Sequence, residues 1–139
     1  MSSGNGSISL SFDGLLRDRV GQAEFALHAD GKTDGVFTLT LNPGSGNRML
    51  TGLYLTNSAG GIWDTLAPDG FWSLGVASDL DGPLLNTAND AVSSSFAEGS
   101  TLKIFAGDYE NSMFLKGVSF TLTADFADGT TATVSTTIP

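Results

Sequence analysis

The sequence predicts an all-β fold, an antiparallel β-sandwich formed by a single domain over residues 1–139. Three observations predict it. Apolar and polar residues alternate with period two in short segments, which gives each segment one buried and one solvated face. Asp-Gly pairs and other glycine-rich stretches separate these segments and favour tight turns. Finally, no window of about a dozen residues shows the helical period of apolar residues.

The first part of the chain is expected to form strands over residues 7–12, 23–29 and 36–41. In each segment apolar residues occupy every second position, with mostly polar residues between them. The Asp-Gly pairs at 13–14 and 34–35 are expected to be turns, because glycine adopts the positive φ that tight turns need.

The middle of the chain predicts strands over residues 50–56, 71–76 and 101–106, separated by loops rich in Gly, Pro and Asn. A short helical turn is expected over residues 93–98. With the C-terminal segments, about eight strands are expected at the spacing typical of sandwiches.

The C-terminal residues show the clearest alternation. Residues 118–126 and 130–138 carry apolar side chains with threonines between them. Asp128-Gly129 lies between the two segments, so we expect a long hairpin closed by a two-residue turn. Threonine favours a pleated surface that is half in water.

The charge of the chain excludes some classes of partner. Fifteen acidic residues against six basic ones give a net charge of −9. Nucleic acid and anionic membranes repel such a chain, since phosphate binding needs clustered Lys and Arg. Without cysteine, the chain has neither a disulfide framework nor a thiolate metal site.

The sequence also argues against an enzyme. His28 is the only histidine, so a nucleophile has one candidate base, and the alternation places that base on the polar face of its strand. Glycoside hydrolysis needs a pair of carboxylates. With twelve aspartates in the chain such a pair is easy to find, so its presence in the sequence is no evidence for a glycosidase. We therefore expect a non-catalytic protein.

Calcium is the cofactor for which the sequence offers ligands. Asp79 and Asp81 begin an acidic loop that continues to Asn86 and Asp90, and Asp108 follows a later strand. Hard cations take six to eight oxygen ligands, which loops rich in Asp and Asn supply. Two interpretations stay open: a calcium site in a loop at the sandwich edge, or Asx turns exposed to water.

A glycan is the second expected ligand. Sugars bind to flat aromatic faces flanked by planar polar groups, and Trp63, Asp64 and Phe71 lie close together around one loop, with Tyr109 as a further aromatic. Trp63 is expected at a strand edge, exposed to solvent. Trp72 shares a strand face with Leu74 and Val76 and is expected in the core.

Three strings are similar to segments of known modules. Residues 126–133, Phe-Ala-Asp-Gly-Thr-Thr-Ala-Thr, follow an alternating strand and resemble the closing hairpin of immunoglobulin-like modules in large secreted bacterial surface proteins. Residues 63–65 and 81–86 resemble loops of the same modules. The resemblance implies an immunoglobulin-like sandwich, with a jelly-roll-like one as alternative, and a binding or spacer role outside the cell. The tryptophan–disulfide pairing of antibody domains is absent.

The leading functional hypothesis is therefore a calcium-stabilised interaction or adhesion module of a secreted or surface protein, binding a glycan or a protein surface. A dedicated carbohydrate-binding module is one alternative. A self-assembling virion or filament protein is another, because the start at Met1 resembles no signal peptide and an exposed edge strand can pair between copies into a homo-oligomer.

Overall fold

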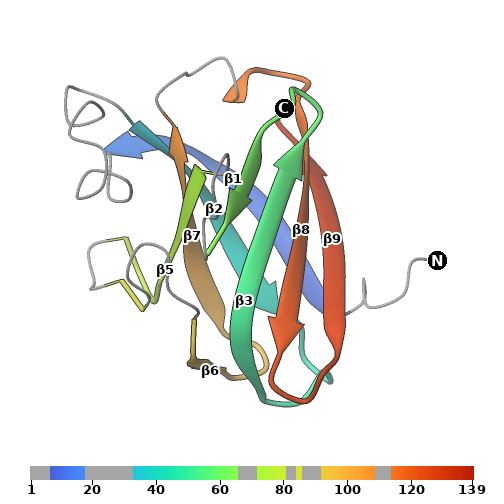
Figure 1. Cartoon of the computed structure of the whole chain (residues 1–139). Coiled ribbons are helices and arrows are strands. Elements are labelled where there is room, and N and C mark those ends of the chain that lie inside the picture. Colours follow the sequence, from blue (N-terminus) through green and yellow to red (C-terminus); the bar gives the residue numbers. More distant parts are fainter. Residues whose placement is uncertain (1–6, 18–32, 66–71, 81–83, 86–91, 109–113) are drawn as a thin grey trace.

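The computed structural model describes residues 7–17, 33–65, 72–80, 84–85, 92–108 and 114–139. The all-β prediction is confirmed: the regular elements of these residues are strands (Figure 1). None of the described segments forms a helix long and apolar enough to cross a membrane. In chain order the strands are β1 (Ile8–Arg17), β2 (Thr33–Leu41), β3 (Arg48–Asn57), β4 (Ile62–Asp64), β5 (Trp72–Ala77), β6 (Ser94–Phe96), β7 (Thr101–Asp108), β8 (Ser119–Phe126) and β9 (Thr131–Thr137).

The strands form two antiparallel sheets that pack face to face. One sheet has the order β1-β2-β7-β5 and the other the order β4-β3-β8-β9, with β6 paired to the start of β3. A two-residue parallel ladder between β4 and β5 joins the sheets along one side. In Figure 1 the β3-β8-β9 layer crosses in front of the β1-β2-β7 layer.

This strand order is that of an immunoglobulin-like sandwich. Lettered along the chain, β1, β2, β7 and β5 correspond to strands A, B, E and D, and β3, β8 and β9 to C, F and G. The added strand β4 lies beside β3, where the C′ strand of variable-type domains lies. The topology therefore favours the immunoglobulin-like form over the jelly roll.

Aromatic rings pack in the core between the two strands that a disulfide links in antibody domains. Phe37 on β2 and Phe120 on β8 come from the two strands that the disulfide links, and their ring centroids lie 5.0 Å apart in an edge-to-face contact. Phe114 stacks on Phe120 at 5.4 Å, and Trp63 lies 5.9 Å from Phe120. Such pairs stabilise a core beyond their area of burial.

The Asp-Gly pairs at 13–14 and 34–35, which were predicted as turns, lie inside strands. At 13–14 the ladder between β1 and β2 shifts register, so that Gly14, with φ of 122°, belongs to a β-bulge. Gly35 continues β2, and a Cβ there would lie 2.2 Å from the ring of Phe114. Glycine is needed at 35 because a phenylalanine packs on the backbone, and not because the chain turns.

Two other local predictions were wrong. Residues 94–96 form β6 and not a helical turn, because their backbone pairs with β3 from Arg48 to Leu50. The last hairpin has a three-residue loop, since Phe126 N–H donates to Thr130 O. Its Gly129 adopts φ of 88°, as this class of loop requires. The strand predicted over 23–29 lies outside the described residues.

The outer face of the β1-β2-β7-β5 sheet is partly apolar. Val36, Ala77 and Phe105 point away from the main core yet are at most 1 % exposed, with Leu84 packed against them. Beside this second cluster, Lys103 Nζ donates to Asp13 Oδ2 at 3.1 Å and to Thr38 Oγ1 at 2.7 Å. These contacts tie β1, β2 and β7 together.

Candidate functional site

The outer face of the β4-β3-β8-β9 sheet is rich in hydroxyl groups and is the candidate site. Register and alternation place these side chains opposite the buried leucines and phenylalanines of the same strands. We call this surface the hydroxyl face. It consists of Ile62, Asp64, Gly52, Tyr54, Thr56, Ser119, Thr121, Thr123, Asp125, Thr131, Thr133, Ser135 and Thr137.

Facing hydroxyls on β8 and β9 are hydrogen-bonded in pairs. Ser119 Oγ and Thr137 Oγ1 are 2.9 Å apart, Thr121 Oγ1 and Ser135 Oγ 3.0 Å, and the hydroxyls of Thr123 and Thr133 3.4 Å. A hydroxyl has one donor and two acceptor sites, so each pair retains capacity for a further partner. The result is a polar surface with a fixed two-residue repeat.

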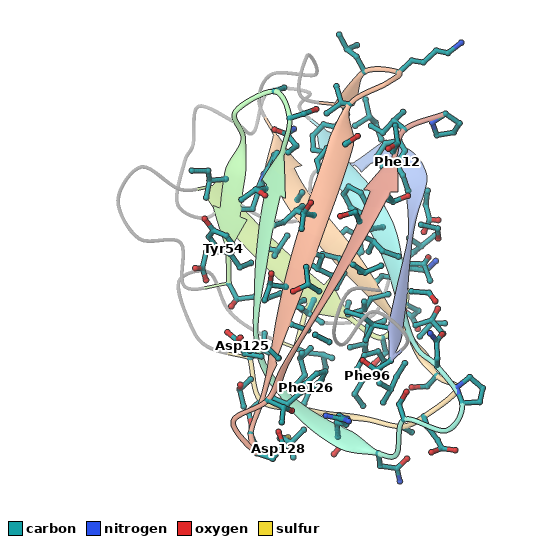
Figure 2. All side chains as sticks on the ribbon, turned by 90° about the vertical axis from the view of Figure 1, so that its right-hand side faces the viewer. Phe12, Tyr54, Phe96, Asp125, Phe126 and Asp128 are labelled. Carbon is teal, nitrogen blue, oxygen red and sulfur yellow. The ribbon has the colours of Figure 1, made fainter. Side chains whose placement is uncertain are left out.

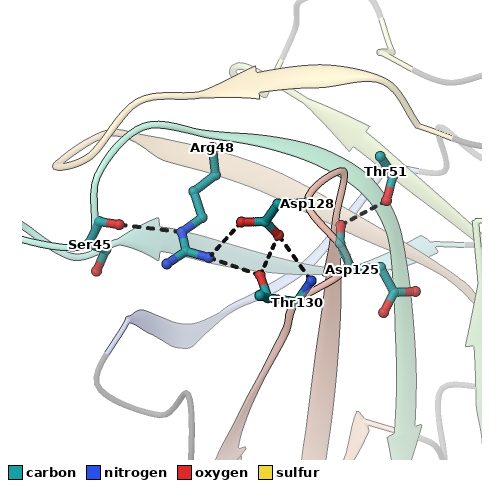
Figure 3. Close-up of polar contacts among 6 residues, drawn as sticks. All are labelled: Ser45, Arg48, Thr51, Asp125, Asp128 and Thr130. Atoms are coloured by element: carbon teal, nitrogen blue, oxygen red, sulfur yellow. Dashed lines mark hydrogen bonds and ion pairs between the residues drawn. The ribbon is translucent and has the colours of Figure 1, made fainter.

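A β-bulge in β3 changes which of its side chains point toward the hydroxyl face. Leu50 and Leu53 both point inward and are at most 1 % exposed, which period two alone does not allow. The register with β8 shifts between Leu50 and Gly52. Thr51 Oγ1 then donates to the carbonyl of Asp125 at 3.1 Å, as Figure 3 shows. Bulges of this kind re-aim side chains and are common beside binding sites.

Tyr54 is the aromatic residue of the hydroxyl face. It is 36 % exposed and lies opposite Asp64 on β4 and Thr123 on β8. In Figure 2 Tyr54 and Asp125 lie toward the same outer side of the molecule, whereas Phe96 lies between the two sheets. A partly exposed tyrosine, carboxylates and hydroxyls therefore share one surface.

Gly52 leaves a gap on the hydroxyl face. A Cβ built on it would lie 3.5 Å from Asp125 Oδ2 and 3.7 Å from Thr65 Oγ1, both ordinary contact distances. Thr65 is only 2 % exposed, and its hydroxyl oxygen accepts a hydrogen bond from Leu53 N–H at 3.4 Å. One buried hydroxyl and one exposed carboxylate thus border the same space. We call this space the Gly52 notch.

A charged corner lies at one end of the hydroxyl face, beside the β8–β9 loop (Figure 3). Arg48 lies over the ring of Phe126 at 5.1 Å, donates to Thr130 Oγ1 at 3.0 Å and approaches Asp128 Oδ2 at 3.8 Å. Hydrogen bonds from the side chain and backbone of Thr130, with the charge of Arg48 as a lesser cause, lower the pKa of Asp128. The corner stabilises the loop.

A shallow pocket of about 280 Å³ opens beside this corner. It is lined by Asn47, Arg48, Met49, Ser95, Phe96 and Ala97. Its aromatic residue, Phe96, is 1 % exposed and belongs to the core. The pocket therefore presents less aromatic surface to a ligand than Tyr54 does.

The prediction that Trp63 is exposed was wrong. Its side chain is fully buried, and its indole N–H donates to the carbonyl of Gly107 in the opposite sheet at 2.7 Å. A buried indole needs such a partner. The short strand β4 belongs to the sheet, so its inward residue enters the core and its outward neighbour Asp64 reaches the surface.

The other predicted site residues are only partly placed. Phe71 and Tyr109 lie outside the described residues, as do Asp81, Asn86 and Asp90 of the expected calcium loop. Asp79 is exposed after β5, and Asp108 is the last residue of β7. In the described part of the chain no three acidic or histidine side chains gather as metal ligands. Calcium binding stays a prediction.

Sequence reasoning left the orientation of Tyr54 open, although a signal was present. Leu53 and Leu55 flank it, and two apolar neighbours of a strand residue indicate that the residue itself faces outward. The contribution of Gly52 had no such signal, because the atoms that border the space beside it come from Asp125 on β8 and from Thr65, the residue after β4.

No protein-family model matches the chain, and no curated protein matches it. Among solved structures, a lipoprotein from Bacteroides thetaiotaomicron has a TM-score of 0.39 and 11 % identity, over 94 % of this chain and 78 % of that one. A family 123 glycoside hydrolase from Clostridium perfringens, described for glycolipid glycan hydrolysis, has a TM-score of 0.37 and 8 % identity, over 96 % of this chain and 27 % of that one. At these values neither likeness identifies a family or a function.

Proposed function

We propose that the protein is a non-catalytic binding module that holds a neutral glycan on the hydroxyl face. The observation that carries the proposal is the exposed ring of Tyr54, set among hydroxyls and two carboxylates on one sheet. Sugar rings have an apolar face of C–H groups and a rim of hydroxyls. An aromatic ring with convergent polar groups matches both.

The charge of the hydroxyl face selects the class of glycan. Its charged side chains are Asp64 and Asp125, and none of its residues is Lys or Arg. Sulfated, sialylated or uronate-containing glycans would meet like charge, which disfavours binding. A neutral hexose chain meets only donors and acceptors of hydrogen bonds.

The same geometry supports binding without hydrolysis. Glycosidases need two carboxyl groups on either side of the scissile bond, one of them in surroundings that raise its pKa. Asp64 and Asp125 both lie on an open sheet surface, on strands separated by β3.

We also propose an extracellular or surface-associated role, where a module of this kind would hold polysaccharide.

Titration of isotope-labelled protein with cellohexaose, maltohexaose and mannohexaose, followed by NMR, tests the proposal. At least one of these sugars should shift amide resonances of β3 and β8. Tyr54→Ala should weaken that binding about tenfold or more, as expected for a central aromatic contact. Leu115→Ala removes another exposed apolar side chain, 57 % exposed and outside the hydroxyl face, and should leave the binding unchanged.

Three results would contradict the proposal. One is the absence of shifts with all three neutral sugars. Another is equal binding by wild type and Tyr54→Ala. The third is concentration-dependent shifts of the same amides without sugar, together with a dimer in sedimentation, which would assign the hydroxyl face to a second copy of the chain.

A further inference from the structure

We propose that the Gly52 notch is a subsite that receives one hydroxyl or hydroxymethyl group of the bound sugar. This inference rests on the proposed function and specifies where the glycan is recognised. Three residues define the subsite: Gly52 leaves the space, Thr65 supplies a donor and Asp125 supplies an acceptor.

The first step concerns the donor. Thr65 is 2 % exposed, and its oxygen accepts from Leu53 N–H at 3.4 Å. Its hydroxyl hydrogen donates to no acceptor among the residues that the structure describes. Buried donors in native proteins are nearly always paired, so a buried hydroxyl of this kind indicates a partner that enters from outside.

The second step concerns the acceptor. The Asp125 carboxylate makes no hydrogen bond within the described part of the chain, since its contact with Thr51 uses the backbone carbonyl. Its Oδ2 lies 3.5 Å from the position that a Cβ of residue 52 would occupy. An ionised carboxylate accepts hydrogen bonds and does not donate them.

The third step combines the two. A group in the notch has to accept from Thr65 and donate to Asp125 at the same time. A hydroxyl does both, whereas an ammonium group cannot accept and a carboxylate cannot donate. The chemistry of the notch therefore selects an alcohol, which is the functional group that sugars carry in abundance.

The fourth step is reach. Tyr54 is two residues from Gly52 on the same face of β3, a separation of about 7 Å along an extended strand. A sugar ring stacked on Tyr54 can place a substituent in the notch. The register with β8 is regular from Gly52 to Tyr54, and the Thr51 hydroxyl donates to the backbone carbonyl of Asp125 beside the notch.

Substitutions at position 52 test the subsite. A Cβ there meets only ordinary contacts, and Gly52 is not among the glycines with positive φ, so Gly52→Val and Gly52→Ser should fold. Gly52→Val fills the notch and should weaken binding of the responding hexose oligosaccharide about tenfold or more. Gly52→Ser places its own hydroxyl between Thr65 and Asp125, so it should weaken binding and raise the melting temperature above that of Gly52→Ala.

The results separate the subsite from the proposed function. Wild-type affinity in Gly52→Val, with binding still lost in Tyr54→Ala, would overturn the subsite and leave the glycan module standing. Binding unaffected by Tyr54→Ala would overturn both. A melting temperature of Gly52→Ser no higher than that of Gly52→Ala would also count against the subsite, because the paired donor and acceptor should hold an internal hydroxyl without any sugar.

Discussion

On the outer face of β2, β7 and β5, Val36, Phe105 and Ala77 are buried. The outward positions of β8 and β9 instead carry Thr and Ser hydroxyls and the carboxylate of Asp125, several of them exposed. Both faces belong to strands with an apolar inner side. Alternation therefore says which residues share a face, but it does not say whether that face meets water.

The two outer faces therefore differ in whether they are available to a polar ligand. The outer side of β1-β2-β7-β5 is closed by an apolar cluster and by the contacts among Lys103, Thr38 and Asp13. The hydroxyl face carries no comparable apolar cover among the described residues, and its exposed tyrosine stands among polar groups. A surface of the second kind is the one that a polar ligand can use.

The largest expected effect separates the two faces directly. Phe105→Ala should lower the free energy of unfolding by about 3–5 kcal/mol, because it opens a cavity in a cluster that is almost fully buried. Thr121→Ala on the hydroxyl face should cost about 1 kcal/mol or less, the range of strand propensity and one cross-strand pair. Urea unfolding of both variants gives the comparison. Equal losses would mean that the hydroxyl face is covered as the other outer face is.

A second experiment concerns the polar half of the closed face. Lys103→Met keeps the apolar stem but removes the charge that faces Asp13 and Thr38. Because both charged side chains are 25–29 % exposed, the loss should be about 0.2–1 kcal/mol and smaller at high salt. Unfolding at low and high ionic strength measures it. A loss as large as that of Phe105→Ala would show that ionic contacts, and not the apolar cluster, hold this face together.

The sequence predicted the sandwich because alternation is a local property. The segments 36–41, 50–56 and 101–106 lie within β2, β3 and β7, and the segment 118–126 contains β8 with one residue before it. The sequence-based prediction failed where the conformation of a residue depends on a partner far away in the sequence. Gly35 is required by the ring of Phe114, and β6 exists only because β3 is available to pair with it.

The candidate site was harder to predict for the same reason. Asp64 was predicted to share a surface with the ring of Trp63, but the exposed aromatic residue beside it is Tyr54, across the ladder. Trp63 is drawn inward by Phe120 and by the carbonyl of Gly107, contacts made across more than 40 positions of sequence. The Gly52 notch likewise needs three segments at once: β3, β8 and the residue after β4.

The smallest expected effect lies at the end of the hydroxyl face, in the β8–β9 loop. Asp128 accepts hydrogen bonds from the hydroxyl and backbone N–H of Thr130, and these lower its pKa below the ordinary value of 3.8. A lowered pKa means that the charged form stabilises the fold above the unfolded pKa, and that this contribution disappears as the pH falls through the folded pKa. The melting temperature of Asp128→Asn should thus lie slightly below that of wild type near neutral pH, and the two should converge in acid as the pH falls through the lowered pKa of Asp128. A difference in melting temperature that persists in acid would show that the loop depends on the shape of the Asp128 side chain and not on its charge. The charged corner would then stabilise the end of the hydroxyl face through packing and neutral hydrogen bonds.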